Sequence, residues 1–240
     1  MLRPYFSDGN ITLYHGDCRE ILPQLEPESV DLILTDPPYG VSYVTNMVDK
    51  NDPMAQPIVG DEDLNMVRDV LPYLDRILRN DRHIYMFGAT MRLGENMEAM
   101  GEYWKLKNVL VWDKGLTGTV GDLTSGYGWN WEAIVYATKG SRPLNRPRPR
   151  CIYRYDWNSR RDPVHPMVKP VGLLQWIIHH SSDSGEMVLD PFCGSGTTLR
   201  AAKNLGRQAI GIEYEERYCE EVAKRLMQAV MPGFEEVPCR

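Results

Sequence analysis

Four consecutive residues, Asp36-Pro37-Pro38-Tyr39, combine groups that could activate an aromatic amine. The lone pair of such an amine is delocalised into its ring, so the nitrogen is a poor nucleophile. Two acceptors aimed at the N–H bonds would draw the nitrogen toward tetrahedral geometry, and preorganised acceptors are strong catalytic elements. Asp36 supplies a carboxylate, a backbone carbonyl near Pro37 supplies the second acceptor, and Tyr39 offers a ring on which an extruded base could stack. We interpret the tetrapeptide as a catalytic motif, with an ordinary Pro-Pro turn as the alternative.

A second motif, residues 190–198, reads Asp-Pro-Phe-Cys-Gly-Ser-Gly-Thr-Thr. Glycines let the backbone approach a ligand, and a helix that starts here presents free N–H groups to an anionic group. Glu213 closes the next apolar run, where an acid commonly accepts hydrogen bonds from ribose hydroxyls. The motif lacks the Gly-Lys-Ser/Thr of a P-loop and the third glycine of a dinucleotide fingerprint, which favours S-adenosylmethionine over ATP and NAD. The cofactor-binding candidates in this part of the chain are Asp190, Phe192, Cys193, Gly194, Ser195, Gly196, Thr197, Thr198 and Glu213.

Both motifs follow short apolar runs that alternate with helical patterns, which predicts an α/β fold with a mostly parallel sheet. The expected strands are 11–14, 30–35, 83–87, 109–112, 133–136, 187–190 and 208–212. The expected helices are 19–25, 64–78, 171–180, 197–205 and 215–230. In open α/β sheets, ligands bind beyond the carboxyl ends of the strands at the topological switch point. If the strands that end at Asp36 and Asp190 are neighbours there, a cofactor and an amine would meet on one edge.

Two segments interrupt this alternation. Residues 41–63 have little periodicity, and we expect a long functional loop or a surface excursion there. Residues 141–162 are basic and bordered or interrupted by prolines, so neither a helix nor a central strand can run through them. Arginine can contact guanine bidentately and neutralise phosphate, so this stretch is a candidate nucleic-acid contact, with a solvated loop as the alternative. Its arginines are Arg142, Arg146, Arg148, Arg150, Arg154, Arg160 and Arg161, interleaved with Tyr153, Tyr155 and Trp157.

The composition limits the remaining possibilities. The 240 residues carry a net charge of −6, so positive charge that contacts nucleic acid must be local. Five scattered cysteines without a Cys-x-x-Cys spacing argue against a disulfide framework and a zinc site, and we expect no metal. The chain has no run of about 18 apolar residues, and its N-terminus lacks the pattern of a signal peptide. We therefore expect a soluble, cytoplasmic protein without a membrane partner.

The two motifs, in this order, resemble the beta class of DNA amino-methyltransferases, in which Asp-Pro-Pro-Tyr precedes the cofactor motif. The resemblance extends over most of the chain. His15-Gly16-Asp17-Cys18 is similar to an N-terminal element of that family whose acid reaches the adenine of the cofactor. The segment 165–170 is similar to a His-Pro-x-x-Lys-Pro element, which implies that Lys169 lies near the methionyl end of the cofactor. Residues 111–114 and 131–140 also resemble this family.

The resemblance implies a Rossmann-like S-adenosylmethionine-dependent methyltransferase fold: a mostly parallel seven-stranded sheet with helices on both faces and a circularly permuted motif order. It implies one domain over residues 1–240, with an inserted target-recognition region at about 113–163. It adds Asp17, Cys18, Asp36, Lys169 and Tyr214 to the cofactor-binding residues. Double-stranded DNA is the implied partner, and the family is compatible with a homodimer and a cognate restriction endonuclease.

The resemblance favours N6 of adenine as the methylated amine, because enzymes that act on N4 of cytosine more often carry Ser-Pro-Pro-Tyr. N4-cytosine methylation remains the main alternative, since the same chemistry applies to its amino group. Glutamine methyltransferases would be expected to carry Asn at position 36, and RNA enzymes usually place the cofactor motif first. A catalytically silent DNA-binding module is a further alternative.

Overall fold

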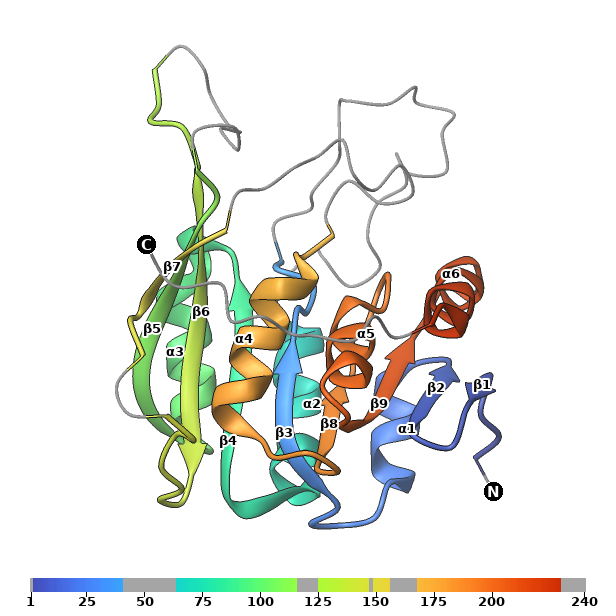
Figure 1. The fold of residues 1–240 in the computed structure, drawn as a ribbon. Coiled ribbons are helices and arrows are strands. Elements are labelled where there is room, and N and C mark those ends of the chain that lie inside the picture. Colours follow the sequence, from blue (N-terminus) through green and yellow to red (C-terminus); the bar gives the residue numbers. More distant parts are fainter. Residues whose placement is uncertain (1, 41–63, 116–124, 147–148, 156–167, 230–240) are drawn as a thin grey trace.

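A computed structural model describes residues 2–40, 64–115, 125–146, 149–155 and 168–229 (Figure 1). Several predictions from the sequence fall outside these residues. They concern the loop at 41–63, Trp157, three of the arginines (Arg148, Arg160 and Arg161) and the first three residues of the 165–170 segment.

The described residues form one nine-stranded sheet with the order β1-β2-β9-β8-β3-β4-β6-β5-β7. The strands are β1 (Phe6–Ser7), β2 (Ile11–His15), β3 (Val30–Thr35), β4 (Leu78–Gly88), β5 (Lys105–Asp113), β6 (Trp131–Lys139), β7 (Ile152–Arg154), β8 (Met187–Asp190) and β9 (Gln208–Glu213). The central strands β2, β9, β8, β3 and β4 are all parallel. β6 runs antiparallel to both β4 and β5, β1 runs antiparallel to β2, and β7 runs parallel to β5.

All seven predicted strands are present, and the sheet is mostly parallel as expected. The expected count of seven is too low, because a short strand is added at each edge of the sheet. β1 has two residues and β7 has three, so neither is long enough to show the alternation from which a strand is predicted. β7 lies in the proline-bordered basic stretch, where the sequence excluded only a central strand.

Helices cover both faces of the sheet, as predicted (Figure 1). One face carries α1 (Cys18–Ile21), α2 (Asn65–Ile77) and α3 (Leu93–Gly101), and the other carries α4 (Val171–Ser181), α5 (Thr197–Asn204) and α6 (Glu216–Met227). Short 3₁₀ turns, η1 (Leu22–Gln24) and η3 (Thr90–Arg92), follow α1 and precede α3. None of the helices in the described part of the chain is long and apolar enough to cross a membrane.

The central strand β3 shows why these residues form a two-sided core. Every residue of β3 is buried. Leu32 and Leu34 pack in the cluster with α4, α5 and α6, whereas Ile33 packs in the cluster with α1, α2 and α3. Successive side chains of a strand point to opposite faces, so residues 32–34 at the centre of this strand, which is covered on both sides, are all apolar.

The sheet has its topological switch point between β3 and β8. These strands are paired neighbours, with Leu32 opposite Val188 and Ile33 opposite Leu189. From β3 the chain continues to β4 on one side, and from β8 it continues to β9 on the other. The predicted adjacency of the two strands is therefore confirmed, and their carboxyl ends form a common edge for ligands.

Candidate active site

Asp36 directly follows β3 and lies at the centre of a small hydrogen-bonded cluster. Its Oδ2 accepts a hydrogen bond from Lys169 Nζ at 2.6 Å, and its Oδ1 accepts one from the hydroxyl of Tyr39. Lys169 Nζ also donates to the Tyr39 hydroxyl at 3.1 Å. The side chain of Asp36 remains 31% exposed, whereas that of Lys169 is only 6% exposed. Asp36 is thus open to a ligand, while Lys169 holds its carboxylate from within the protein.

The tetrapeptide places its other residues around this carboxylate. Pro37 is buried, and Pro38 is half-buried. The ring of Tyr39 packs against the core cluster on the α4 face, and its hydroxyl is bound to Asp36. The predicted stacking role of Tyr39 stays a prediction.

Burial and charge act in opposite directions on this cluster. Burial raises the pKa of Asp36, and the ammonium of Lys169 opposes that rise. For Lys169, burial alone would lower the pKa, but the carboxylates of Asp36 and Glu132 outweigh it and raise the pKa to about 12. Lys169 is therefore a permanent cation that favours the ionised form of Asp36.

Glu132 is a member of this site that motif analysis of the sequence did not identify. It is the second residue of β6, and its Oε2 lies 3.2 Å from Lys169 Nζ. Its Oε1 lies 2.5 Å from Nζ of Lys114, the residue that follows β5. Although burial raises the pKa of Glu132, the two lysines lower it overall. The only signal in the sequence was its position within 131–140, a stretch that resembles the methyltransferase family.

Asp190 ends β8 and accepts hydrogen bonds from three neighbouring donors. Its Oδ1 accepts hydrogen bonds from Thr35 Oγ1 at 2.9 Å and from the backbone N–H of Phe192 at 3.2 Å. Thr198 also bonds its carboxylate. Burial raises the pKa of Asp190 to about 6. The carboxylate thus fixes the start of the predicted cofactor turn.

The turn itself requires glycine at two positions. Gly194 has φ +48° and Gly196 has φ +74°, a left-handed conformation that residues with a Cβ rarely adopt. A Cβ on Gly196 would lie 2.7 Å from Val222 of α6. The N–H of Gly196 closes the turn on the carbonyl of Cys193 at 2.7 Å, and α5 begins at Thr197. The predicted sequence of strand, glycine turn and helix is therefore present.

Glu213 ends β9 beside this turn. Its Oε2 accepts the N–H of Gly194 at 2.8 Å, and its Oε1 accepts the N–H of Glu215 at 2.8 Å. Burial raises the pKa of Glu213 to about 7. The predicted ribose acceptor is thus held against the glycine turn.

The N-terminal element reaches the same edge through β2, which pairs with β9. The N–H of Gly16 donates to the carbonyl of Glu213 at 2.9 Å. Asp17 caps α1 and forms an ion pair with Arg19 at 2.7 Å, so its carboxylate already has a cationic partner.

The remaining predicted cofactor residues differ in exposure. Cys18 and Cys193 are buried in the two core clusters, and Phe192 packs partly against one of them. Ser195, Thr197 and Thr198 are buried in the turn and at the start of α5, whereas Tyr214 is 54% exposed. Lys169 contacts Asp36 and Tyr39 of the tetrapeptide, and also Glu132. Its predicted position near the methionyl end of a cofactor stays a prediction.

The arginines of the basic stretch do not all lie near this edge. Arg142 forms ion pairs of 2.9 Å with both Asp183 and Glu186, which precede β8 at the opposite, amino end of the central strands. We therefore withdraw Arg142 from the DNA-binding candidates, because its charge is neutralised within the protein. Arg146, Arg150 and Arg154 are exposed, and Arg154 lies on β7 opposite Asp113.

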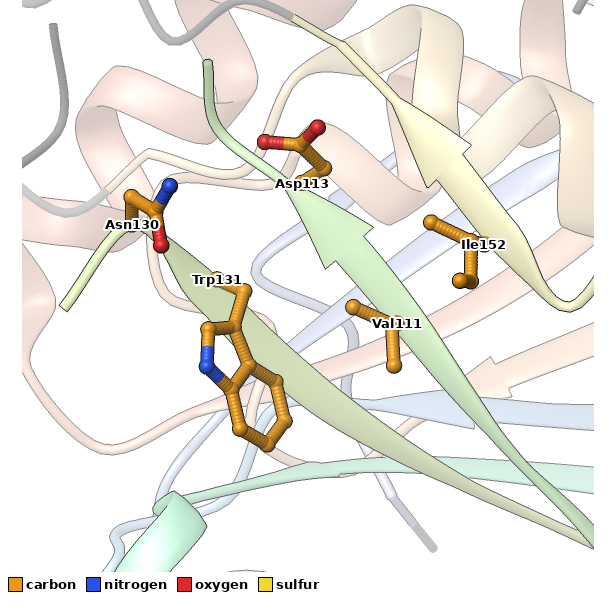
Figure 2. A pocket seen from close by; sticks show the side chains of 5 residues that line it. All are labelled: Val111, Asp113, Asn130, Trp131 and Ile152. Carbon is orange, nitrogen blue, oxygen red and sulfur yellow. The ribbon is translucent and has the colours of Figure 1, made fainter. Parts of the chain in front are cut away.

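A pocket of about 300 Å³ lies on the β5–β6–β7 part of the sheet (Figure 2). Val111, Asp113, Asn130, Trp131 and Ile152 line it. Trp131 faces this pocket, whereas the next residue, Glu132, contacts Lys169; successive side chains of a strand point to opposite faces. The pocket is therefore separated from Asp36 by the sheet itself.

Comparison with known proteins gives a consistent family relationship. A family model described as DNA methylase, N6_N4_Mtase, matches residues 30–225. The chain is 30% identical to the type II methyltransferase M2.DpnII of Streptococcus pneumoniae, over 94% of this chain and 93% of the relative. It is 29% identical to the type II methyltransferase M2.LlaDCHI of Lactococcus lactis subsp. cremoris, over 97% of this chain and 95% of that relative.

Solved structures show the same architecture. The M1.HpyAVI–SAM complex matches with a TM-score of 0.70 and 26% identity, covering 91% of this chain and all of that chain. The cytosine-N4-specific PvuII DNA methyltransferase matches with a TM-score of 0.75 and 17% identity, covering 98% of this chain and 92% of that chain. At 17% identity this second likeness concerns the fold alone.

Proposed function

Because the chain belongs to the DNA methylase family of N6-adenine and N4-cytosine amino-methyltransferases, we propose that it methylates N6 of adenine in duplex DNA, using S-adenosylmethionine. The observation that carries this proposal is the Asp36 cluster. An accessible carboxylate, held by Lys169 and Tyr39, stands at the end of β3, next to the strand that leads into the glycine turn.

The residues at this edge fit the cofactor. S-adenosylmethionine carries a cationic sulfonium, an amino group and two ribose hydroxyls, all of which favour anionic or acceptor groups. The edge offers the carboxylates of Asp17, Asp190 and Glu213 around the turn of Gly194 and Gly196. When bound, the cofactor supplies the methyl group.

Asp36 is placed to act on the substrate amine. Tyr39 and Lys169 each use one lone pair of one carboxylate oxygen, which leaves acceptor capacity on both oxygens for the N–H bonds of the amine. Accepting those bonds draws the lone pair of the nitrogen out of the ring. Methylation leaves the nitrogen with one proton too many, and Asp36 is the base that can receive it. Lys169 favours the ionised carboxylate, against the burial that raises the pKa of Asp36.

Duplex DNA would contact the chain through the inserted region at about 113–163, within a single domain over residues 1–240. Arg146, Arg150 and Arg154 are exposed in the described part of this region and could neutralise phosphates or contact bases. An amine inside a duplex cannot reach Asp36, so the base must be extruded.

Asp at position 36 is the basis for adenine rather than cytosine. N4-cytosine methylation remains the second candidate, because the same carboxylate could accept hydrogen bonds from either amine. We also infer that the chain acts in the cytoplasm beside a cognate restriction endonuclease and forms a homodimer, proposals that rest on its similarity to type II methyltransferases.

The proposal is tested by incubating purified protein with labelled S-adenosylmethionine and duplex DNA, then digesting the DNA to nucleosides. The expected product is N6-methyladenine. Recovery of N4-methylcytosine alone would overturn the choice of base. Label found only in RNA or protein, or DNA binding without methyl transfer, would overturn the enzyme class.

A further inference from the structure

Four side chains of alternating charge link the β5–β6 hairpin to the catalytic carboxylate. Lys114 Nζ lies 2.5 Å from Glu132 Oε1, Glu132 Oε2 lies 3.2 Å from Lys169 Nζ, and Lys169 Nζ lies 2.6 Å from Asp36 Oδ2. The first three side chains are 6–14% exposed, and only Asp36 opens further to solvent. Limited solvent access reduces the screening of these charges, so each one interacts strongly with its neighbours.

The sheet order explains why Lys169 can bridge the two acids. Asp36 follows β3, Glu132 is the second residue of β6, and β4 lies between these two strands. The ammonium of Lys169 lies 5.1 Å from the ring centroid of Phe87, near the end of β4. Lys169 therefore spans the intervening strand, with one carboxylate on each side.

We propose that Glu132 is a positioning residue for methyl transfer, which holds the Lys169 ammonium against Asp36 and is itself held by Lys114. This inference rests on the proposed role of Asp36. A lysine ammonium is a point charge with three donors on a flexible four-carbon stem, so a single partner does not fix its position. Glu132 is fixed by a strand that pairs on both sides, with β4 and with β5.

The key variant is Glu132→Gln, which keeps the shape of the side chain and removes its charge. In single-turnover assays, we expect the methyl-transfer rate to fall by roughly 10–100-fold, because small misplacement of a catalytic group has effects of that size. Affinity for S-adenosylmethionine and for DNA should change by less than about 2-fold, since Glu132 acts on neither directly.

Glu186→Gln provides a matched control. Glu186 is also a shielded carboxylate paired with two cations, Arg82 and Arg142, but it lies at the amino end of the central strands. Its side chain is 19% exposed, against 14% for Glu132. We expect Glu186→Gln to lower the melting temperature without changing the methyl-transfer rate.

A double-mutant cycle shows whether Glu132 acts through Lys169. In a Lys169→Met background, Glu132→Gln should reduce the rate by less than about 2-fold more, because the two substitutions remove the same contact. If Glu132→Gln fails to fold, as judged by circular dichroism, Lys114→Met tests the ion pair between Lys114 and Glu132. We expect this variant to lower the methyl-transfer rate by a smaller factor.

Three results would overturn the inference: an unchanged rate in Glu132→Gln, multiplicative effects of the Glu132 and Lys169 substitutions, or loss of ligand affinity as large as the loss of rate. An unchanged rate in Lys114→Met would show that the contact between Lys114 and Glu132 does not contribute to methyl transfer. A wild-type protein that fails to methylate DNA would instead overturn the proposed function, so the two failures are distinguishable.

Discussion

Thr35 Oγ1 donates a hydrogen bond to Asp190 Oδ1 at 2.9 Å, which joins the last residue of β3 to the last residue of β8. Both side chains are buried. The bond couples the strand that precedes Asp36, the proposed catalytic carboxylate, to the strand that precedes the glycine turn. The relative position of the two motifs is thus set by a direct contact between their strands.

Replacing Thr35 with Val should test this contact. Val keeps the shape of Thr but leaves the buried Asp190 with one donor fewer, so we expect a loss of about 1–2 kcal/mol in the free energy of unfolding. Thr35→Ser retains the hydroxyl and serves as the control. Urea unfolding of both variants measures the difference, and equal stability of Thr35→Val and wild type would show that the bond contributes nothing.

Asp36→Asn should separate catalysis from cofactor binding. The amide loses the negative charge and one of the two acceptor oxygens, so we expect the methyl-transfer rate to fall by roughly 100–1000-fold or more. Affinity for S-adenosylmethionine, measured by calorimetry, should stay within a few-fold of wild type, because Asp190 and Glu213 remain in place. An equally severe loss of cofactor affinity would mean that Asp36 belongs to the cofactor site instead.

Glu213 should make cofactor binding depend on pH. Burial raises its pKa from 4.5 to about 7, and an ionised carboxylate accepts hydrogen bonds from hydroxyls more strongly than a protonated one. Affinity for S-adenosylmethionine should therefore rise between pH 6 and pH 8, by about 10-fold or less, which corresponds to one charge-assisted hydrogen bond. In Glu213→Gln the affinity should be weaker and should not rise between pH 6 and pH 8. Glu215→Gln is the control: its side chain is 40% exposed, and the rise in affinity should be retained.

Glu213 should also make the stability of the free protein depend on pH, but stability should fall with rising pH whereas cofactor affinity rises. Its folded pKa lies above its unfolded value, so between pH 4.5 and about 7 the folded state retains a proton that the unfolded state has lost. Stability should consequently decrease as the pH rises through this window, and Glu213→Gln should reduce that decrease. Thermal unfolding at pH 5 and pH 8 compares the two proteins; an identical pH dependence would contradict the assignment.

Gly172 should be intolerant of even a small side chain. It lies in the first turn of α4, where a Cβ would come within 2.7 Å of the Tyr155 ring. Tyr155 cannot retreat freely, because its backbone is hydrogen-bonded to Trp112 Nε1 and to the carbonyl of Asp113, and its ring stacks on Tyr153. We expect Gly172→Ala to cost about 1–2 kcal/mol of stability through overpacking.

Gly94→Ala is the control for Gly172→Ala. Gly94 also lies in a helix, α3, but a Cβ there would have no neighbour within 4 Å. Because alanine is the better helix former, stability should increase by about 0.5–1 kcal/mol. Urea unfolding of the two variants should therefore give shifts of opposite sign, and a stabilised Gly172→Ala would show that Tyr155 yields easily.

The sequence identified the parts of the fold that depend on local pattern. Strand β8 has the predicted limits, because its apolar run lies between a glycine turn and Asp190. Strand β4 begins at Leu78, five residues before the prediction, because its first part is a polar run. Arg79 and Arg82 in that run form ion pairs with Asp31, a contact across two strands that no local pattern contains.

In the candidate site, too, local sequence pattern identified some residues, whereas contacts between distant parts of the chain could not be predicted. Asp36, Asp190 and Glu213 each end an apolar strand, so their common edge follows from a parallel sheet. Glu132 could not be predicted in this way, because its contact with Lys169 depends on β6 lying two strands from β3. Arg142 was assigned wrongly for a related reason, since its partners Asp183 and Glu186 are about forty residues away in the sequence. Helix α3 escaped prediction because glycines at both of its ends weaken the helical pattern.

The strand order also has a consequence for how the chain is synthesised. β8 and β9 are inserted between β2 and β3, although among the described strands they are the last to leave the ribosome. Until residues 187–213 emerge, β2 lacks its parallel neighbour β9 and β3 lacks its parallel neighbour β8, so the sheet remains divided between β2 and β3. Nascent chains that are stopped before β8 should therefore expose two unpaired strand edges, which are prone to aggregation.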